Sequence, residues 1–520
     1  MSPSRPRDPS PATPILAGVG QSSERLGEPG YRRLSPADLA AGAVRAALAD
    51  TGARPAAVAA AIDTVAGVRQ FEVSGPWARA PLGRSSNFPR SVAARVGAAP
   101  GRAILEVTGG QAPQHLLTEL AAAIAAGGSE VALVTGAEAI STIRHYAKAP
   151  GRPDFTEDPG GSLEDRGYGL DGMFTAHEAA HGLVTAASQY ALLENARRAR
   201  LGIGRAQYAA AMGALLAPFT KVAAANPHAA SRTVRSAAEL ITPAPGNRLV
   251  ADPYLRYLVA REKVNQGAAV LLTSVAAARR LGIPRERWVF LHGHADLRER
   301  NLLERADLSA APASVLAARQ ALAVAGLHPA ELATLDLYSC FPVAVFTMCE
   351  GLGLSASDPR GLTVTGGLPF FGGPGNNYSL HAIAETVQRV RATPGSYGFV
   401  GANGGVMSEY SAGVYSTAPA PWRPGRSARL QAEVDSWAAP PQAPRAGGRG
   451  TIETATVSYR RDGTPTGIIV GRLDADGRRF VARTAEDDSV AIGVLGTGEP
   501  AGAPVEVRSG EAGNRITGIG

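Results

Sequence analysis

The sequence is poor in cysteine and has no long apolar run. Its 520 residues include two cysteines, Cys340 and Cys349, which offer neither a disulfide framework nor a Cys-x-x-Cys pair for metal or redox chemistry. No stretch approaches the ~20 consecutive apolar residues that cross a membrane. Residues 1–14 lack the apolar core of a signal peptide. We therefore expect a cytoplasmic protein without a membrane partner.

Lysine is scarce, whereas arginine is abundant. Lys148, Lys221 and Lys263 are the only lysines among 52 basic residues, which with 45 acidic residues give a net charge of +7. Part of this charge reflects the Ala-, Gly-, Arg- and Pro-rich composition typical of a GC-rich genome. Without a long basic run or a nucleic-acid motif, we expect no nucleic-acid partner. Two interpretations stay open, a scattered basic surface and attraction of an anionic ligand such as a nucleotide diphosphate.

The chain contains an internal repeat. Residues 44–65 and 318–338 share one pattern, a helix closed by a glycine, a proline three residues later and then a buried strand. Downstream, the tetrapeptide Val-Thr-Gly-Gly occurs at 107–110 and again at 364–367, each time ahead of a predicted helix and strand. Because the matches recur in the same order, the sequence predicts a duplicated α/β unit.

Three segments differ from the repeated unit. Residues between the two halves show helical periodicity, as in 186–200 and 208–219, which predicts a helical cap. A Pro-, Ala- and Gly-rich stretch is typical of a linker. The short strands with Asp-Gly turns that follow it predict a small OB-like β-barrel. The predicted division is a disordered N-terminus 1–13, a first half 14–140, a cap 141–250, a second half 251–417, a linker 418–450 and a β-rich domain 451–520.

The repeated unit with its cap resembles the thiolase superfamily. The matching segments, in chain order, are 106–110 for the loop that carries the nucleophilic cysteine, 264–273 for the Asp-Gly-Ala-Ala strand, 336–341 for the His-Asp-Cys-Phe loop, 365–374 for the segment ending in Gly-His-Pro, and 401–405 for the C-terminal Cys-x-Gly loop. The resemblance covers about residues 14–415. It is closest to the sterol-carrier-type thiolases and to thiolase-like protein type 1, a subgroup labelled acetyl-CoA acetyltransferase that carries an added C-terminal domain.

The resemblance implies an α/β duplicated thiolase fold and also a loss of chemistry. Thiolases use a cysteine thiolate, a second cysteine, a histidine and an oxyanion donor. The corresponding positions hold Glu106 (or Val107) for the nucleophile, Gly401 for the second cysteine, Gly373 for the histidine and Tyr338 for the donor. Without a thiolate no acyl-enzyme forms, so we expect a protein that handles CoA thioesters but is not a normal thiolase.

Several residues are candidates to replace the missing ones. Cys340 precedes a predicted helix, 343–352, whose N-terminus would favour a thiolate. The alternative is a buried packing role, which is the more common one for a free cysteine. Tyr338 and His381 form a second candidate pair for acid–base chemistry, as in related thiolase-fold retro-aldolases that use tyrosines and pair with OB-fold domains. With Glu106, these are the catalytic candidates. The alternative for Tyr338 and His381 is a purely structural hydrogen-bonding role.

For coenzyme A, the resemblance points to the cap and its adjacent loops. His228, Arg232, Asn247 and Arg248 are the candidate ligand-binding residues, with arginines suited to phosphate. A structural role for these loops stays open. The implied ligand is an acyl-CoA thioester, and no covalently bound cofactor is implied.

One motif resembles a zinc site. His177, Glu178 and His181 match the zincin pattern, but Gly182 follows at once and no third ligand stands at a suitable spacing, so we expect no metal. Three hypotheses remain: a degenerate thiolase-fold enzyme or CoA-ester binder, a retro-aldolase acting on a CoA-linked lipid or steroid acid, and a non-catalytic scaffold whose C-terminal domain binds a protein partner. Both a monomer and a homodimer are compatible with the sequence.

Overall fold

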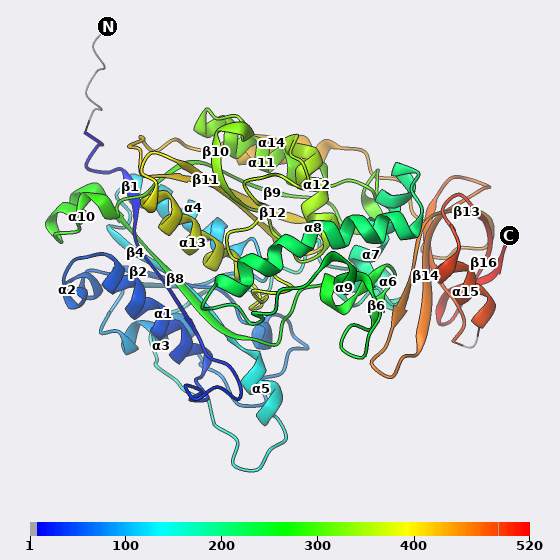
Figure 1. Ribbon diagram of the computed structural model, residues 1–520, viewed down its shortest axis with the longest axis horizontal. Helices are drawn as coiled ribbons and strands as arrows, with labels where there is room; N and C mark the ends of the chain where they lie inside the picture. The colour runs from blue at the N-terminus through cyan, green and yellow to red at the C-terminus, as the bar shows by residue number, and fades with distance from the viewer. Residues whose placement is uncertain (1–7, 487) are drawn as a thin grey trace, which may run out of the picture.

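Two halves of the same design form the main body of the computed structural model, which describes residues 8–486 and 488–520 (Figure 1). The first half builds a six-stranded sheet in the order β1-β8-β4-β2-β3-β5. Its elements are β1 (Pro14–Ser23), α1 (Pro36–Asp50), α2 (Pro55–Ala60), β2 (Thr64–Gly67), α3 (Phe88–Arg95), β3 (Arg102–Leu105), α4 (Ala112–Ala125), β4 (Val131–Ala139), β5 (Glu164–Asp165), β8 (Asn265–Ser274) and α10 (Val275–Arg280).

The second half repeats this succession around a four-stranded sheet in the order β10-β11-β12-β9. Where the first half has β3, the second has an extended segment tied by the hydrogen bond from Leu337 N to Leu362 O (2.9 Å). The duplicated thiolase-type α/β fold predicted from the sequence is thereby confirmed. The elements are β9 (Phe290–Arg298), α11 (Pro312–Ala325), β10 (Leu332–Asp336), α12 (Pro342–Leu352), α13 (Tyr378–Ala392), β11 (Tyr397–Gly404) and β12 (Glu409–Ser416).

The repeated sequence pattern has a backbone cause. Gly52 and Gly326 end α1 and α11, and each has a φ of +72°, a left-handed conformation that side chains with a Cβ rarely adopt. The prolines that follow begin the helical turns α2 and 329–331, because proline lacks the amide hydrogen that a first helical turn leaves unused. Each turn leads directly into a strand of its sheet.

Helices α4 and α13 lie between the two sheets (Figure 1). α4 contacts β8 of the first sheet and β12 of the second, while α13 contacts β8 and β11. Because each helix packs against both sheets, the side chains that face either sheet are mostly apolar. Each helix follows one of the Val-Thr-Gly-Gly segments, so the helix N-termini bring these two segments toward one region between the halves.

A helical cap covers this region, as predicted. α8 is long and apolar enough to cross a membrane by length and composition alone. However, its residues Tyr208, Leu216 and Phe219 belong to the main hydrophobic core, as expected for a core helix of a folded domain. The cap elements are α5 (Ile140–Tyr146), α6 (Ala176–Ala180), α7 (Ala186–Leu201), α8 (Arg205–Ala225), α9 (Ala237–Ile241), β6 (Leu249–Ala251) and β7 (Tyr254–Leu255).

The C-terminal domain is a closed five-stranded barrel, in agreement with the β-rich prediction. Its strands run in the order β14-β15-β17-β16-β13, and β13 pairs with β14 to close the barrel around residues such as Val457, Ile469 and Phe480. Its elements are β13 (Gly448–Tyr459), β14 (Pro465–Leu473), β15 (Arg479–Arg483), α15 (Ser489–Thr497), β16 (Pro504–Gly510) and β17 (Gly513–Ile519).

The segments expected to be irregular contain ordered structure. Within 418–450, α14 (Ser427–Ser436) packs on β9, and Ser427 Oγ accepts a hydrogen bond from Asp296 N (3.0 Å). Prolines flank this helix on both sides and give the segment its linker-like composition. Of the expected disordered N-terminus, residues 1–7 lie outside the described residues. The part next to β1 binds α10 through the hydrogen bond from Ala276 N to Pro11 O (2.9 Å).

The barrel is docked firmly on the rest of the molecule. Arg479 is only 1% exposed, forms an ion pair with Glu453 (2.6 Å) and donates to the backbone oxygens of Leu303 (3.1 Å) and Ala306 (3.3 Å). β13 also pairs with β6, which joins the barrel sheet to the cap. The barrel and the thiolase-like body therefore share one hydrogen-bonded interface.

Candidate functional site

An apolar cavity of about 560 Å³ lies where both halves meet the cap. Loops at the N-termini of α4 and α13, the first turn of α7 and the β11–β12 turn enclose it. Its walls are mostly apolar and aromatic, which suits an organic ligand held by shape and a few polar contacts. The lining side chains used below are Phe71, Phe174, Val184, Tyr190, Val259, Ala260, Glu262, Tyr338, Cys340, Leu368, Asn376 and Asn403.

The mouth of this cavity carries exposed apolar side chains. Phe71 and Val184 line the cavity and are 41% and 60% exposed. Trp77 is 55% exposed and its ring lies 5.6 Å from that of Phe174, which also lines the cavity. Exposed apolar groups gathered at one opening are typical of a site that receives an apolar ligand.

Tyr338 points its hydroxyl into the cavity. It follows β10, and its ring packs edge-on against Tyr378 at 5.3 Å. A Cβ built on Gly110 would overlap the Tyr338 hydroxyl, so glycine is required where the two segments cross. Burial raises the pKa of Tyr338, which keeps the phenol protonated. Among the described residues this hydroxyl has no hydrogen-bond partner, and it can therefore donate to a ligand.

Cys340 also lines the cavity, but its environment disfavours a thiolate. Asn403 Nδ2 lies 3.6 Å from the sulfur, and burial raises the pKa of Cys340 to about 12. The expected help from the N-terminus of α12 is lost because Glu194 accepts the hydrogen bond of Val343 N there (2.7 Å), so its carboxylate already meets the helix end. The prediction of an activated nucleophile at Cys340 is not supported by this geometry.

His381 lies outside the cavity. It is fully buried on α13, where Nδ1 donates to Gln21 Oε1 (2.7 Å) and the ring packs 5.1 Å from Phe371. Burial lowers the pKa of His381, so the imidazole is neutral. The structure thus does not bring Tyr338 and His381 together, because α13 directs His381 toward β1 instead.

The two glycines expected at the second-cysteine and histidine positions differ in the space around them. A Cβ built on Gly401, the second-cysteine position, would overlap the Tyr410 hydroxyl. At Gly373, the histidine position, the nearest atom would be a Leu368 methyl at 3.3 Å. Among the described lining residues Glu262 is the sole carboxylate, it pairs with Arg144, and no histidine is present. The cavity therefore offers hydrogen-bond donors but no free base.

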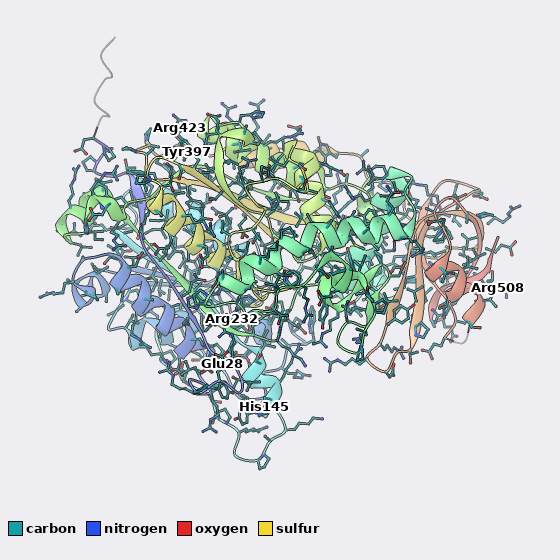
Figure 2. All side chains as sticks on the ribbon, viewed as in Figure 1. Glu28, His145, Arg232, Tyr397, Arg423 and Arg508 are labelled. Atoms are coloured by element: carbon teal, nitrogen blue, oxygen red, sulfur yellow. The ribbon has the colours of Figure 1, made fainter. Side chains whose placement is uncertain are left out.

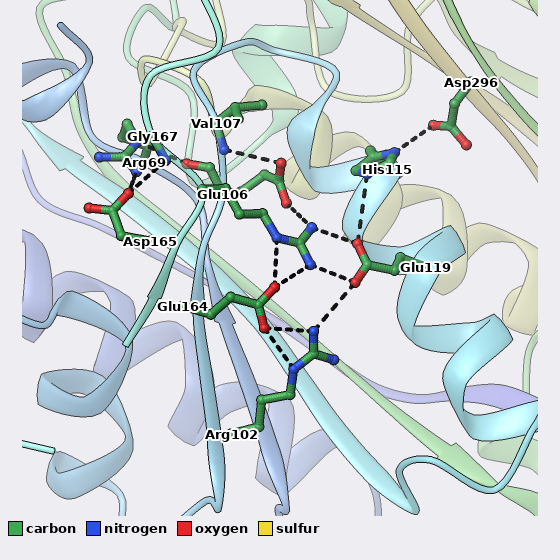
Figure 3. Close-up of polar contacts among 11 residues, drawn as sticks. Arg69, Arg102, Glu106, Val107, His115, Glu119, Glu164, Asp165, Gly167 and Asp296 are labelled. Carbon is green, nitrogen blue, oxygen red and sulfur yellow. Dashed lines mark hydrogen bonds and ion pairs between the residues drawn. The ribbon is translucent and has the colours of Figure 1, made fainter. Parts of the chain in front are cut away.

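Glu106 does not line the apolar cavity but a separate one of about 380 Å³, where it belongs to a network of charged side chains (Figure 3). Its carboxylate pairs with Arg166 (2.6 Å), which also binds Glu119 (2.6 Å). His115 lies 3.4 Å from Asp296; burial would lower the pKa of His115, but the hydrogen bond to Asp296 and the nearby negative charges outweigh it and raise the pKa to about 9. Glu106, expected at the nucleophile position of thiolases, is here the buried member of a partly exposed network of ion pairs.

This network also accounts for a metal-like cluster. Glu106, His115 and Glu119 bring ligand atoms within 4.8 Å of one another. The guanidinium of Arg166 donates to both carboxylates, so a protein cation already occupies the place that a metal ion would need. The cluster fits an arginine-centred ion-pair network rather than a metal centre.

The zincin-like motif has a structural role. Glu178 forms a capping box with Thr175 at the start of α6. His181 donates from Nδ1 to His177 O (2.7 Å) and accepts from Asn514 N of the barrel at Nε2 (2.8 Å). Both imidazole nitrogens are therefore engaged within the protein, and the motif helps to join cap and barrel.

A second, cationic cavity of about 700 Å³ adjoins the apolar one. The two share Val259, Ala260 and Glu262 as lining residues. Burial and the neighbouring Arg256 lower the pKa of Arg261, as expected where positive charges crowd without anions. Within the described residues, only Arg144 of its seven basic residues has an acidic partner. The seven are Arg144, Arg235, Arg248, Arg256, Arg261, Lys263 and Arg461.

The predicted CoA-binding residues fall into different places. Arg248 lines the cationic cavity, whereas His228 lines an adjacent cavity of about 320 Å³. Burial and nearby arginines lower the pKa of His228 to about 4, so it is uncharged at neutral pH. Arg232 lies in an exposed loop and donates to Pro227 O (2.7 Å; Figure 2).

Asn247 is a correction to the sequence-based expectation. It is fully buried, and its Nδ2 donates to the carbonyls of Glu239, Leu240 and Thr242 while its Oδ1 accepts from Tyr257 N. Both N–H donors of its amide are used, and full burial keeps its oxygen away from a ligand. Sequence reasoning missed the more relevant residues Arg256, Arg261 and Lys263, although three basic residues within eight positions were a visible signal.

Comparisons with known proteins give one close relative and several fold neighbours. The family model of the "Thiolase-like protein type 1 additional C-terminal domain" matches residues 429–512. The crystal structure of a monomeric SCP2-thiolase like protein type 1 (STLP1) from Mycobacterium smegmatis is 49% identical, with 98% of this chain and 99% of that chain covered and a TM-score of 0.85. No curated protein matches the chain.

Two more distant structures share the fold alone. The Ltp2-ChsH2(DUF35) aldolase is 22% identical over 78% of this chain and 98% of that chain, with a TM-score of 0.56. The dimeric peroxisomal thiolase of Saccharomyces cerevisiae is 13% identical over 79% of this chain and 98% of that chain, also with a TM-score of 0.56. Both alignments leave about a fifth of this chain unmatched.

Proposed function

The chain belongs to the SCP2-thiolase-like proteins type 1, and from that premise we propose that it binds a coenzyme A thioester with a bulky apolar acyl group, without the acyl-enzyme chemistry of thiolases. The observation that carries the proposal is that the two cavities adjoin, with Val259, Ala260 and Glu262 lining both. One cavity is cationic and the other apolar, so together they suit a ligand with a polyanionic end and an apolar end.

The charges support a ligand that carries several phosphates. Six of the seven basic residues of the cationic cavity lack an acidic partner among the described residues. Crowded guanidinium groups repel one another unless an anion neutralises them, and arginine binds phosphate through paired hydrogen bonds. The diphosphate and 3′-phosphate of coenzyme A fit this requirement, and the pantetheine arm can extend past residues 259–262 toward Tyr338.

The apolar cavity supports binding more than acyl transfer. A ping-pong thiolase reaction needs a thiolate and a base. Here Cys340 has a pKa of about 12, and Glu262, the one carboxylate among the described lining residues, is held by Arg144. The phenol of Tyr338 and the amide of Asn376 instead provide polar groups that can orient a ligand carbonyl.

Isothermal titration of the full chain with coenzyme A and with acyl-CoAs of increasing chain length tests this proposal. We expect the affinity to rise with acyl length, because each buried methylene contributes about 0.8 kcal/mol. It should fall with added salt, because phosphate contacts are screened. Absence of heat at millimolar ligand refutes the proposal. Conversion of acetoacetyl-CoA and free CoA into two acetyl-CoA at rates above background refutes the loss of thiolase chemistry.

Carbon–carbon cleavage of a 3-hydroxyacyl-CoA is a second candidate. It is favoured by the unpartnered Tyr338 hydroxyl in the cavity. As the C2–C3 bond breaks, the phenol gives its proton to C2 of the enolate, and the proton that the 3-hydroxyl group loses on becoming a carbonyl restores the phenol. The fold neighbour described as an Ltp2-ChsH2(DUF35) aldolase makes this reaction class relevant. If turnover exists, Tyr338→Phe should reduce it at least about 100-fold, the usual contribution of a general acid. An unchanged rate would exclude the role.

We also propose that the protein acts as a monomer, like its 49% identical relative from Mycobacterium smegmatis, which is described as monomeric. The outer edge of β3 pairs with β5, with Ile104 and Leu105 opposite Glu164 and Asp165, and is therefore closed to a strand of a second copy. Light scattering after size exclusion tests this state. A protein partner at the barrel stays a hypothesis, and a pull-down with the isolated barrel as competitor tests it.

A further inference from the structure

The C-terminal barrel reaches the cationic cavity through one of its hairpins. The tip between β13 and β14 carries Arg461, which lines that cavity together with Arg248 and Arg256. The other basic lining residues come from the cap and the thiolase-like body. The cavity thus has one wall from a domain that the typical thiolase fold does not contain.

The root of this hairpin is fixed to the cap. β13 pairs with β6 through Ser458 and Ala251, and Asp252 N donates to Val457 O (2.9 Å). Thr456 Oγ1 donates in turn to Asp252 O (2.8 Å). Strand pairing therefore sets the distance between the hairpin and Arg248, which directly precedes β6.

The other two arginines lie on a neighbouring hairpin. Arg248 and Arg256 flank β6 and β7, and Arg256 N donates to Arg248 O (2.9 Å). Because β6 is the strand that β13 joins, two hairpins from two domains present their arginines to one cavity. Backbone pairing thus fixes where the two hairpins lie relative to each other.

The tip itself leaves Arg461 available for a ligand. Arg460 N donates to Thr464 O (3.0 Å), and the Asp462 carboxylate accepts from Thr464 N (2.9 Å), so this acid is used by the turn. Arg460 pairs with Glu486 (3.5 Å), whereas Arg461 has no acidic partner among the described residues. Adjacent arginines on one hairpin thus have different roles.

We infer that the added C-terminal domain is a component of the ligand site, and that Arg461 binds a phosphate of the nucleotide end of the CoA thioester. The inference rests on the proposed function, and it goes further by giving the barrel a part in recognition. A guanidinium presented by the barrel would bind the same polyanion as Arg248 and Arg256 and would couple barrel docking to ligand affinity.

Titration calorimetry of the full chain with coenzyme A, comparing Arg461→Ala with Arg460→Ala, tests the inference. Both variants remove one positive charge from the same exposed turn, so general electrostatic attraction and any effect on folding are matched. We expect Arg461→Ala to weaken coenzyme A about tenfold, which is the loss of one charge-assisted contact, and Arg460→Ala to change it less than about twofold. Arg461→Glu should weaken it further. Pantetheine, which lacks the phosphates, should bind all variants equally.

The outcomes separate the inference from the proposed function. If the wild-type chain binds coenzyme A and Arg461→Ala binds it as tightly, the barrel takes no part and the inference is overturned. If both alanine variants lose the same amount of coenzyme A affinity, the attraction is non-specific, and the inference is overturned as well. If the wild-type chain binds no coenzyme A, the proposed function fails and the inference falls with it.

Discussion

Replacing Arg479 with alanine should separate the barrel from the body of the protein. The Arg479 side chain is 1% exposed, and it joins Glu453 of β13 to the backbone oxygens of Leu303 and Ala306 in the thiolase-like body. Its removal leaves buried carbonyl groups without a donor, whereas Glu453 keeps Arg472 as a partner (2.9 Å). Each buried acceptor that loses its donor typically costs about 1–3 kcal/mol, so the loss is a large part of the stability of a domain.

Hydrogen exchange read out by mass spectrometry is the suitable assay, because it shows which segments of the chain lose stability. We expect faster exchange in segment 302–306 and in β13 and β15, with little change in β1 or β8. Arg478→Ala is the matched control, since Arg478 is the exposed neighbour that pairs only with Asp476 (2.7 Å), and its loss should change stability by less than about 0.5 kcal/mol. Equal exchange in the two variants would refute the assigned role of Arg479 in docking.

Three further predictions concern the cavity and its surroundings. Cys340, with a pKa of about 12, should resist iodoacetamide at pH 8 in the folded protein and react once guanidinium unfolds it; prompt labelling of the folded protein contradicts the assignment. Gly401→Cys should destabilise the protein by about 1–3 kcal/mol, because the new side chain meets the Tyr410 hydroxyl, and Tyr410→Phe in the same chain should restore part of the loss in thermal unfolding. Burial, opposed only in part by Arg298 and His115, raises the pKa of Glu409 to about 8, so the folded state keeps a proton that the unfolded state has released. Stability should therefore fall between about pH 4.5 and 8, and Glu409→Gln should flatten this dependence; parallel profiles would exclude it.

Glycine is required at different points of the fold for different physical reasons. Gly52 and Gly326 close equivalent helices, since any residue with a Cβ is strained at a φ of +72°. At Gly401, in contrast, the constraint is space, because a Cβ there would overlap the Tyr410 hydroxyl.

Local pattern was sufficient to predict the duplicated fold, the cap helices and the barrel. Glycines with fixed φ, prolines at first turns and alternating strands act through a few neighbouring residues, so their effect is visible along the chain. The assignment of Gly373 and Gly401 to the histidine and second-cysteine positions came instead from the resemblance to thiolases, and it stays a prediction.

The site depended on contacts between residues far apart in the sequence. Glu106 and His381 are close in sequence to cavity residues. However, Glu106 forms an ion pair with Arg166 and His381 hydrogen-bonds to Gln21, so neither side chain lines the apolar cavity. Cys340 lines the cavity without becoming a thiolate, because Glu194 from the cap already meets the helix N-terminus. Pairing of β13 with β6 likewise places Arg461 beside Arg248, 213 positions earlier in the chain. Side-chain direction, burial and charge pairing are set by packing, and only the tertiary structure could decide them.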